Sequence, residues 1–374
     1  MSRIALAVAG MAVFVVLPAS PAQADRIRND QWHLQFLKVS EAHRFSQGEG
    51  ILIAVPDTGV DPHPDLRNNL LPGRDITADG SNDGRRDRNS HGTAMAGLIA
   101  AHGRGSSGAL GMAPAAKILP IVSSANEQST ADYLAAGVEH ALHEGADVIS
   151  ISSVGGSSAR LQEAINAALQ ANVIIVAAAG NQPEDFVVGY PARHPGVIAV
   201  GGVDRDGNHA AISVTGREID VVAPATDIYS TSYDGKYAKG SGTSSATAIV
   251  AGAVALIRAR YPELPATEVV HRLTATAIDK GPPGRDDQYG YGVIDLVAAL
   301  TADVPPLAAQ PPTASAPADA TPTTTAAGPG SGGDGPAGWL LATGGLAALG
   351  VGAAWALAAR RRRRTGAASP PAGG

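Results

Sequence analysis

The chain has 374 residues and not one cysteine. This absence excludes disulfide bonds, zinc–thiolate sites and a cysteine nucleophile. It does not argue against export, since a domain with a large enough core needs no disulfide outside the cell. Aromatic residues make up only 4% of the chain and charged residues 17%, whereas hydrophobic residues reach 44%. The composition predicts a full-sized core.

Positive charge is concentrated at the two ends. The net charge is −6, yet Arg3 is the one charged residue among the first 24, and Arg360 to Arg364 are the charged residues after Gly338. The part between is therefore more acidic than the chain as a whole. A nucleic-acid partner is not expected, because contacts with phosphates require a basic surface.

Residues 1–24 have the features of a secretory signal peptide. A single arginine precedes an apolar run, and Ala22-Gln23-Ala24 offers a cleavage site of the small-x-small type. An uncleaved membrane anchor is the alternative, but the polar residues that follow the alanines favour cleavage. We expect the mature chain to begin at Asp25, with an N-terminal extension over residues 25–49.

A second apolar segment covers residues 339–359 and is long enough to cross a bilayer as a helix. The arginine-rich tail, residues 360–374, follows at once and would stay in the cytoplasm. The uninterrupted run and the arginines argue against a buried soluble helix. A sortase-processed wall anchor is also disfavoured, since Leu340–Gly344 matches its processing site poorly. We predict a single-pass protein of the cell membrane with an extracytoplasmic body.

Between the two ends, the sequence divides into a folded domain over residues 50–303 and a linker over residues 304–338. The linker is rich in Pro, Ala, Thr and Gly. Such a segment buries too little apolar surface to order itself, which is typical of a tether.

Within the domain, short apolar runs alternate with longer helical patterns. The alternation predicts an α/β fold with a mainly parallel sheet and crossover helices. Ligand sites of such folds lie beyond the carboxyl ends of the strands. Asp57 is expected just after the first strand and Asn181 just after the fourth. We expect strands at Ile51–Val55, Lys117–Val122, Val148–Ile151 and Val173–Ala178, and helices at Ala131–His143, Ala159–Ala171 and Ala246–Arg260.

Three short segments supply an acid, a base and a nucleophile in the order Asp57, His91, Ser244. A serine hydroxyl needs a base within hydrogen-bond reach, and the base needs an orienting partner. A histidine has a suitable pKa for the base. Helices are expected to begin at His91 and Ser244, where free backbone N–H groups suit a developing oxyanion. The segments are Val55-Pro56-Asp57-Thr58-Gly59-Val60, His91-Gly92-Thr93-Ala94-Met95-Ala96-Gly97 and Ser241-Gly242-Thr243-Ser244-Ser245-Ala246.

Each residue alone has an ordinary structural explanation. Asp57 could shape a turn, Ser244 could cap a helix and His91 could do either. Their joint occurrence, in this order and with these small flanking residues, favours catalysis. The order Asp, His, Ser is that of subtilisin, whereas chymotrypsin-like enzymes and α/β-hydrolases have other orders.

On these motifs the chain resembles the subtilisin-like (subtilase) serine proteases, peptidase family S8. The resemblance implies a three-layer α/β/α fold, with Ser244 as nucleophile, His91 as general base and Asp57 as its orienting carboxylate. It also implies that Asn181, in Ala177-Ala178-Ala179-Gly180-Asn181, donates its amide to the oxyanion.

The same resemblance assigns substrate binding to the segment Ser152, Ser153, Val154 and Gly155, which would pair with the substrate backbone and wall the P1 pocket. The pattern leaves the register of these residues open by one position. The chain departs from the family at Ser90, where a glycine is usual, and at Ala248, where a proline is common. Neither departure removes a catalytic group.

The short extension, the tether and the membrane segment together look like mycosins, the membrane-anchored subtilases of type VII secretion systems in actinobacteria. The expected partners are a protein or peptide substrate, the membrane through the C-terminal helix, and type VII secretion components. The expected function is processing by peptide-bond hydrolysis. The alternative is a structural component of a secretion complex with dispensable protease activity.

No cofactor and no catalytic metal is expected. The acidic segment from Asp75 to Asp87 offers carboxylates of the kind that bind structural calcium in some subtilases. A solvated turn accounts for the same residues, and the sequence gives calcium no further support.

Overall fold

The chain divides into two units, residues 1–313 and 314–374. In the computed structural model every described residue lies in the first unit. The predicted transmembrane segment, the tail and most of the signal peptide and linker lie outside the described residues. Within the described part, no helix is both long and apolar enough to cross a bilayer. The structure describes residues 22–77, 80, 82–125 and 128–307.

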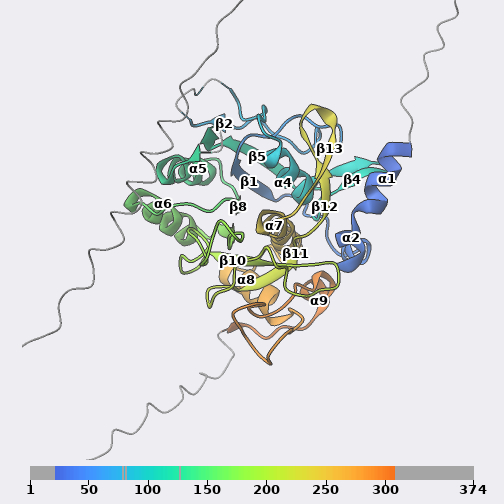
Figure 1. Cartoon of the computed structure of the whole chain (residues 1–374), viewed down its shortest axis with the longest axis vertical. Coiled ribbons are helices and arrows are strands. Elements are labelled where there is room, and N and C mark those ends of the chain that lie inside the picture. The colour runs from blue at the N-terminus through green and yellow to red at the C-terminus, as the bar shows by residue number, and fades with distance from the viewer. Residues whose placement is uncertain (1–21, 78–79, 81, 126–127, 308–374) are drawn as a thin grey trace, which may run out of the picture. The chain divides into compact units, whose positions relative to one another are not determined.

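A parallel seven-stranded sheet forms the centre of this unit (Figure 1). Its strand order is β11-β10-β9-β8-β1-β5-β2, and every neighbouring pair is parallel. The predicted mainly parallel sheet is therefore confirmed. The strands are β1 (Leu52–Asp57), β2 (Arg74–Asp75), β5 (Lys117–Val122), β8 (Val148–Ile151), β9 (Ile174–Ala178), β10 (Ile198–Val203) and β11 (Val221–Pro224).

Two of the four predicted strands, β5 and β8, have the predicted bounds, and β9 begins one residue late. The first strand is displaced: β1 includes Asp57, which the sequence placed just after it. Pairing with β5 continues to the Asp57–Val122 position, so the ladder extends beyond the apolar run. Three antiparallel pairs complete the described strands: β3 (His102–Arg104) with β4 (Ser107–Leu110), β6 (Ser124–Ala125) with β7 (Gln128–Ser129), and β12 (Ile228–Thr231) with β13 (Tyr237–Gly240).

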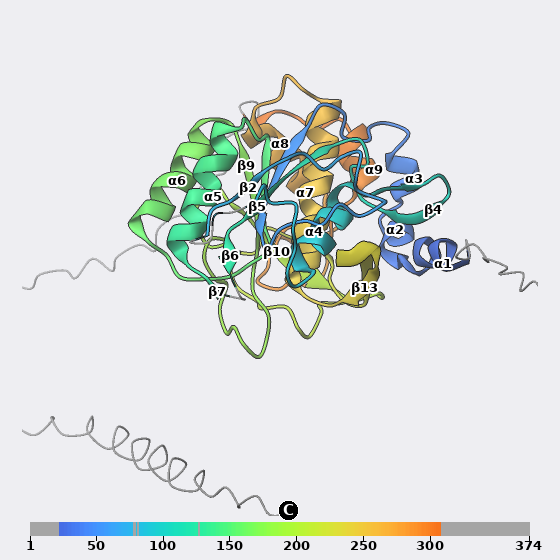
Figure 2. The ribbon, with the colours of Figure 1, turned by 90° about the horizontal axis from the view of Figure 1, so that it is seen from above.

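Helices cover both faces of the sheet (Figure 2). Because successive strand residues point to opposite faces, Ile53 and Val55 join the core beneath α4 and α7, while Ala54 joins the core beneath α5 and α6. The result is three layers. The principal helices are α4 (His91–Ala100), α5 (Ala131–His143), α6 (Ala159–Gln170), α7 (Thr243–Arg260), α8 (Ala266–Ala275) and α9 (Leu296–Thr301).

The helix predictions hold closely. The bounds of α5 are as predicted, α6 ends one residue early, and α4 begins at His91. Helix α7 begins at Thr243, one residue before the expected start at Ser244 and three residues before the periodic apolar pattern from Ala246. Thr243 and Ser244 are weak helix formers, so the apolar pattern by itself did not include them.

The N-terminal extension packs onto the body through α1 (Ala22–Asp30), α2 (Trp32–Phe36) and α3 (Val39–Ala42). The predicted signal-cleavage position after Ala24 falls within α1. Leu37 and Val39 are buried in the same core as α7. The Gln31 amide donates to two backbone oxygens, those of Leu110 and Tyr229. The described extension is thus part of the fold.

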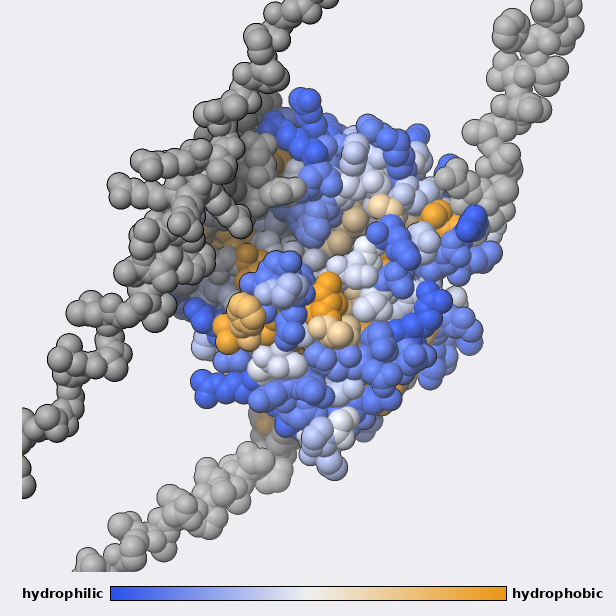
Figure 3. All heavy atoms as spheres, in the orientation of Figure 1, coloured by the Kyte–Doolittle hydropathy of each residue, from blue (hydrophilic) through white to orange (hydrophobic). Residues whose placement is uncertain are grey.

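The surface seen from the side of Figure 1 is mostly hydrophilic where it is described, and its hydrophobic residues lie in small separate patches (Figure 3). Hydrophobic residues are concentrated instead on the two faces of the sheet, where α4 and α7 enclose one core and α5 and α6 the other. The edge at the carboxyl ends of the strands is where site residues are expected.

Candidate active site

Three neighbouring strands bring predicted site residues to one edge of the sheet. Asp57 is the last residue of β1, Ser152 follows β8, and Asn181 lies three residues after β9. The order β9-β8-β1 makes these strands adjacent. Since the strands are parallel, their carboxyl ends lie at the same edge. Segments far apart in sequence therefore meet where the sequence predicted a site.

Asp57 and His91 are in direct contact. The His91 Nδ1 atom lies 2.8 Å from Asp57 Oδ1 and 2.9 Å from Oδ2. The His91 side chain is 35% exposed, whereas that of Asp57 is 4% exposed. The charge of Asp57 raises the pKa of His91 above its usual value, against the opposing effect of burial. The carboxylate thus stabilises the imidazolium form and fixes which ring nitrogen faces outward.

Ser90, one of the two departures from the family pattern, has a left-handed backbone with φ of 79°. A non-glycine residue rarely adopts this region, which glycine occupies without steric cost. The conformation gives a physical reason for the usual glycine. In this chain the strain is borne by a serine whose hydroxyl lies 2.6 Å from that of Ser232.

Asp87 is a positioning residue that the sequence reasoning missed. Its carboxylate accepts hydrogen bonds from the Thr58 hydroxyl, from the Ser90 backbone and from both the backbone and the hydroxyl of Thr93. Thr58 in turn accepts from the Gly92 backbone. The strand end that carries Asp57 is thereby tied to the first turn of α4. A signal existed in the sequence, since an aspartate shortly before a helix often satisfies its free N–H groups.

Ser244 lies in the first turn of α7, close to Asn181. A Cβ atom placed on Gly242 would be 3.3 Å from Ser244 Oγ and 3.5 Å from both amide atoms of Asn181. Asn181 Oδ1 accepts from the Thr243 backbone at 2.9 Å. With Oδ1 acting as acceptor, Nδ2 is the atom left to donate. The bond to Thr243 therefore fixes the amide orientation and leaves Nδ2 as the donor group, which is the group that the predicted oxyanion role requires.

The structure joins the predicted residues as two pairs, Asp57 with His91 and Ser244 with Asn181. Helices α4 and α7, which carry His91 and Ser244, pack against each other. Among the described residues no direct hydrogen bond links the His91 ring with the Ser244 hydroxyl. Such bonds are often long without substrate and shorten in the complex.

The predicted substrate-binding segment follows β8 and contacts the Ser244 backbone. Ser152 Oγ donates to the Ser244 carbonyl oxygen at 3.2 Å. Ser153 and Val154 are half-buried, and Gly155 is exposed. The Gly155 N–H donates to the Tyr190 carbonyl at 3.0 Å, which makes an isolated antiparallel bridge.

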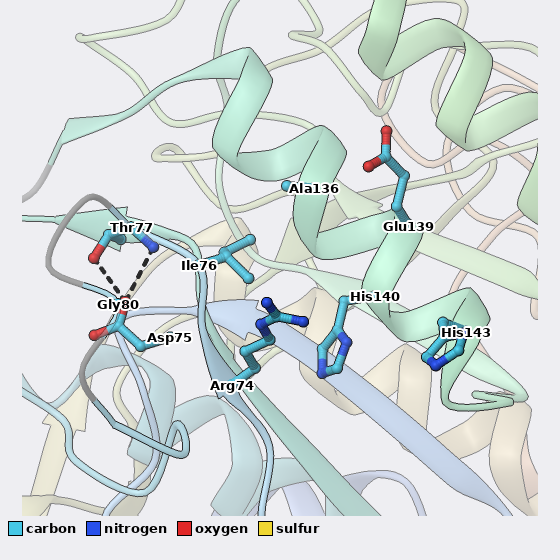
Figure 4. A pocket seen from close by; sticks show the side chains of 9 residues that line it. All are labelled: Arg74, Asp75, Ile76, Thr77, Gly80, Ala136, Glu139, His140 and His143. Carbon is cyan, nitrogen blue, oxygen red and sulfur yellow. Dashed lines mark hydrogen bonds between the residues drawn. The ribbon is translucent and has the colours of Figure 1, made fainter.

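The acidic segment is not simply a solvated turn, because its first and last carboxylates are buried. Asp75 accepts bonds from the backbone and hydroxyl of Thr77 (Figure 4) and from Asn82. The buried Asp87 carboxylate accepts the hydrogen bonds from Thr58, Ser90 and Thr93 that are described above. Their charge is offset by internal donors. Among the described residues, no group of three or more His, Cys, Asp or Glu side chains is arranged to hold a metal ion.

A separate pocket lies between the edge strand β2 and helix α5 (Figure 4). Its lining includes Arg74, Glu139, His140 and His143 and none of the predicted site residues. Glu139 pairs with Arg160 at 2.7 Å. Burial lowers the pKa of His140. The predicted catalytic residues belong to a different part of the molecule.

Comparison with known proteins gives a consistent result. The model of the subtilase family matches residues 48–292. The thermostable alkaline protease of Halalkalibacterium halodurans is 38% identical over 267 residues, which cover 70% of this chain and 71% of that protein.

Solved structures of two type VII secretion proteases are also similar. MycP1 from Mycobacterium smegmatis has a TM-score of 0.67 and 30% identity, covering 73% of this chain and 85% of MycP1. The MycP3 protease from the type VII (ESX-3) secretion system has a TM-score of 0.65 and 32% identity, covering 73% and 88%. The chain belongs to the subtilase family and is a serine endopeptidase of the subtilisin type, with the mycosins among its structural relatives.

Proposed function

We propose that the chain is a membrane-anchored, extracytoplasmic endopeptidase that cleaves peptide bonds through an acyl-enzyme, with Asp57, His91 and Ser244 as its triad. The observation that carries the proposal is the contact of His91 Nδ1 with both oxygens of the Asp57 carboxylate. This contact leaves Nε2 as the nitrogen that can accept a proton from a serine. The nearby pair of Ser244 and Asn181 supplies a nucleophile beside an oxyanion donor.

In the first half of the reaction, Ser244 Oγ attacks the scissile carbonyl carbon while His91 Nε2 takes the hydroxyl proton. The carbonyl oxygen becomes an oxyanion and accepts from Asn181 Nδ2 and from the Ser244 backbone N–H in the first turn of α7. The buried Asp57 carboxylate offsets the positive charge that develops on the ring.

The intermediate then collapses. The bond between the carbonyl carbon and the leaving nitrogen breaks, and His91 gives its proton to the departing amine. An ester joins the acyl group to Ser244. Water attacks this ester with His91 again acting as base, and the acid product and free serine result. Each proton removed is returned, so the enzyme ends unchanged.

The decisive experiment is Ser244→Ala in the full-length protein. We expect loss of peptide hydrolysis and of labelling by a fluorophosphonate probe. The matched control is Ser241→Ala, three residues earlier and exposed, whose hydroxyl accepts from the Asp227 backbone. The control should keep its labelling. Equal labelling of Ser244→Ala and wild type would overturn the triad.

We further propose that the enzyme processes a protein linked to type VII secretion. The similarity to MycP1 and MycP3 supports this setting, as do the predicted signal peptide, tether and membrane segment. Cell fractionation combined with protease treatment of intact cells tests the topology. The domain should be digested from outside while a tag placed after Arg364 survives. A protected domain would contradict the anchor.

A role as a structural component of the secretion complex is the second candidate. The observation in its favour is that a similar structure, MycP1, is described as an essential component of the type VII (ESX-1) secretion system. Complementation of a deletion strain with Ser244→Ala separates the two roles. Restored secretion would favour the structural role, and failed secretion at normal protein levels would favour proteolysis.

A further inference from the structure

The pocket between β2 and α5 is large and separate from the proposed triad (Figure 4). Its volume is about 560 Å³, which is within the range of sites that hold small molecules. One wall is formed by Arg74 to Thr77, at and just after β2, and the other by the second half of α5, from Ala136 to His143. None of the three proposed catalytic residues lines it. Its chemistry is therefore independent of the proposed hydrolysis.

Both walls of this pocket are fixed by contacts with the sheet. On the strand side, the Ile76 N–H donates to the Val122 carbonyl at 3.0 Å. On the helix side, a Cβ atom built on Gly137 would lie 3.2 Å from Pro56 Cβ and 3.4 Å from Ile76 Cδ1. Helix α5 thus packs closely against β1 and the Ile76 side chain. The pocket is formed without a ligand, as is usual for small-molecule sites.

The two carboxylates that line the pocket already have partners. Glu139 forms a bidentate pair with Arg160, with N···O distances of 2.9 and 2.7 Å. Asp75 is buried and accepts hydrogen bonds from the backbone and hydroxyl of Thr77 and from the Asn82 amide. The negative charge that lines the pocket is therefore offset from within the protein.

The cationic side chains that line the pocket lack such partners. Among the described residues, no hydrogen bond or ion pair engages the guanidinium of Arg74 or the ring of His143. The Arg74 and His140 side chains extend toward each other (Figure 4). His140 Nδ1 lies 3.8 Å from Glu144 Oε1, which is too far for a hydrogen bond. The free hydrogen-bonding capacity of the pocket is thus that of donors.

The electrostatic environment of His140 leads to the same conclusion. Burial lowers its pKa, Glu144 partly offsets this effect, and the positive charges of Arg74 and His143 lower the pKa further. An anion bound between these groups removes their mutual repulsion, whereas a cation increases it. Histidines in the last turn of a helix also suit the helix dipole, but the dipole does not account for Arg74, which belongs to β2.

We propose that this pocket is a binding site for a terminal phosphate group, carried by a soluble phosphate ester or by a lipid headgroup, and that Arg74, His140 and His143 hold it. Three separate donor groups suit a phosphate, because it offers three acceptor oxygens. A carboxylate would be satisfied by the guanidinium alone, which binds both of its oxygens. In the phosphate complex the guanidinium donates to two oxygens and the imidazoles donate to the third.

Calorimetric titration of the full-length protein in detergent with glycerol 3-phosphate tests the site. At about pH 6, where imidazoles are largely protonated, we expect one saturable site per chain. Arg74→Gln should weaken binding about ten- to a hundred-fold, since it removes a charged hydrogen-bonding partner. Arg74→Lys keeps the charge without the fork and should lose less. Arg67→Gln, which removes an exposed arginine outside the pocket, should bind as wild type does.

The His140 ring gives a second readout, which needs no variant at the binding residues other than one to assign its signal. A bound phosphate should raise the pKa of His140, because a negative charge favours the imidazolium form. NMR titration of isotope-labelled histidine rings measures this pKa with and without glycerol 3-phosphate, and His140→Gln identifies the signal. A pKa that phosphate leaves unchanged would overturn the proposal.

Short-chain lipids in the same calorimetric titration identify the source of the phosphate. Dihexanoyl phosphatidic acid carries a terminal phosphate, whereas dihexanoyl phosphatidylcholine does not and is the control. Tighter binding of the phosphatidic acid than of glycerol 3-phosphate, lost in Arg74→Gln, supports the site and assigns it to a lipid headgroup. Equal binding of the two supports the site and assigns it to a soluble ester. The absence of saturable binding, or equal binding by wild type and a folded Arg74→Gln, would show that the pocket does not hold phosphate.

Discussion

Two histidines of this chain each lie beside an aspartate, but they differ in solvent exposure, in distance from the carboxylate and in the direction of their pKa shifts. His91 Nδ1 contacts Asp57 at 2.8 Å, and its side chain is 35% exposed. His63 Nδ1 lies 3.9 Å from Asp65 Oδ2, and both side chains are fully buried. The charge of Asp57 raises the pKa of His91, whereas burial lowers the pKa of His63.

The difference arises from how each carboxylate is used. Asp65 accepts from the Tyr237 hydroxyl at 2.7 Å and from the Ala109 backbone at 2.8 Å, and it pairs with Arg104. His63 Nδ1 accepts from the Asp65 backbone N–H, which requires this nitrogen to be unprotonated. Asp57 instead contacts an imidazole that is partly exposed to solvent. Residue type alone therefore does not distinguish the two pairs; the exposure of the histidine and the donors around the carboxylate do.

The largest expected effect is the loss of activity in Asp57→Asn. The amide cannot stabilise the imidazolium or hold the same tautomer, and the equivalent change in a chymotrypsin-type triad lowers kcat by about 10⁴-fold. Steady-state hydrolysis of a peptide substrate measures the loss. Asp65→Asn should keep kcat within a few-fold per folded molecule. Similar losses in both variants would remove the functional distinction between the pairs.

A third histidine is buried without a hydrogen-bond partner for either ring nitrogen among the described residues. This residue, His33, is fully buried, and burial lowers its pKa to about 3. Below pH 6.5 the unfolded chain therefore binds a proton at His33, which the folded chain does not bind until the pH falls to about 3. Stability should fall as pH drops from 6.5, by about 5 kcal/mol below pH 3.

Urea unfolding measured across this pH range should show that the free energy of unfolding falls less steeply with decreasing pH in His33→Leu than in wild type. His143→Leu, which removes an exposed histidine, is the control and should leave this slope unchanged. An equal slope for His33→Leu and wild type would mean that His33 is protonated in the folded chain.

The next effect concerns stability at neutral pH. Asp65→Asn removes a charge to which Arg104 is paired and weakens the bond from Tyr237, and breaking a buried pair typically costs about 3 to 5 kcal/mol. Because Arg104 is partly exposed, we expect the lower end of this range, about 3 kcal/mol, in the free energy of unfolding. Asp57→Asn should change it by less than about 1 kcal/mol. The reverse order would contradict the structural role of Asp65.

The smallest expected effect is a shift in the pH at which kcat/KM falls. His91 must be neutral to act as base, so kcat/KM should fall as pH drops through its raised pKa, which lies above 6.5. In Asp57→Asn the charge that raises the pKa of His91 is gone. The residual kcat/KM should therefore fall at a lower pH than the kcat/KM of wild type. The same shift means that His91 stabilises the fold below pH 6.5 and loses this contribution as pH rises through its pKa. If kcat/KM falls at the same pH in both proteins, the titration of a group other than His91 causes the fall.

Sequence patterns predicted much of the sheet and the principal helices, because buried strands and amphipathic helices have short-range periodicity. They did not place Asp57 inside β1 or begin α7 at Thr243, since these boundaries depend on ladder pairing and on the turn at Gly242. The burial of Asp75 was also missed. A carboxylate in an acidic loop looks solvated until its donors, here Thr77 and Asn82, are placed around it.

The sequence by itself predicted the set of candidate catalytic residues and their order, because the motifs around Asp57, His91 and Ser244 are local and specific. It could not show how the His91–Asp57 and His63–Asp65 pairs differ in solvent exposure and in hydrogen bonding, since both are properties of the packed chain. Nor could it tell that Val154 lies against Gly189. These residues are 35 positions apart, and only the tertiary structure brings them into contact.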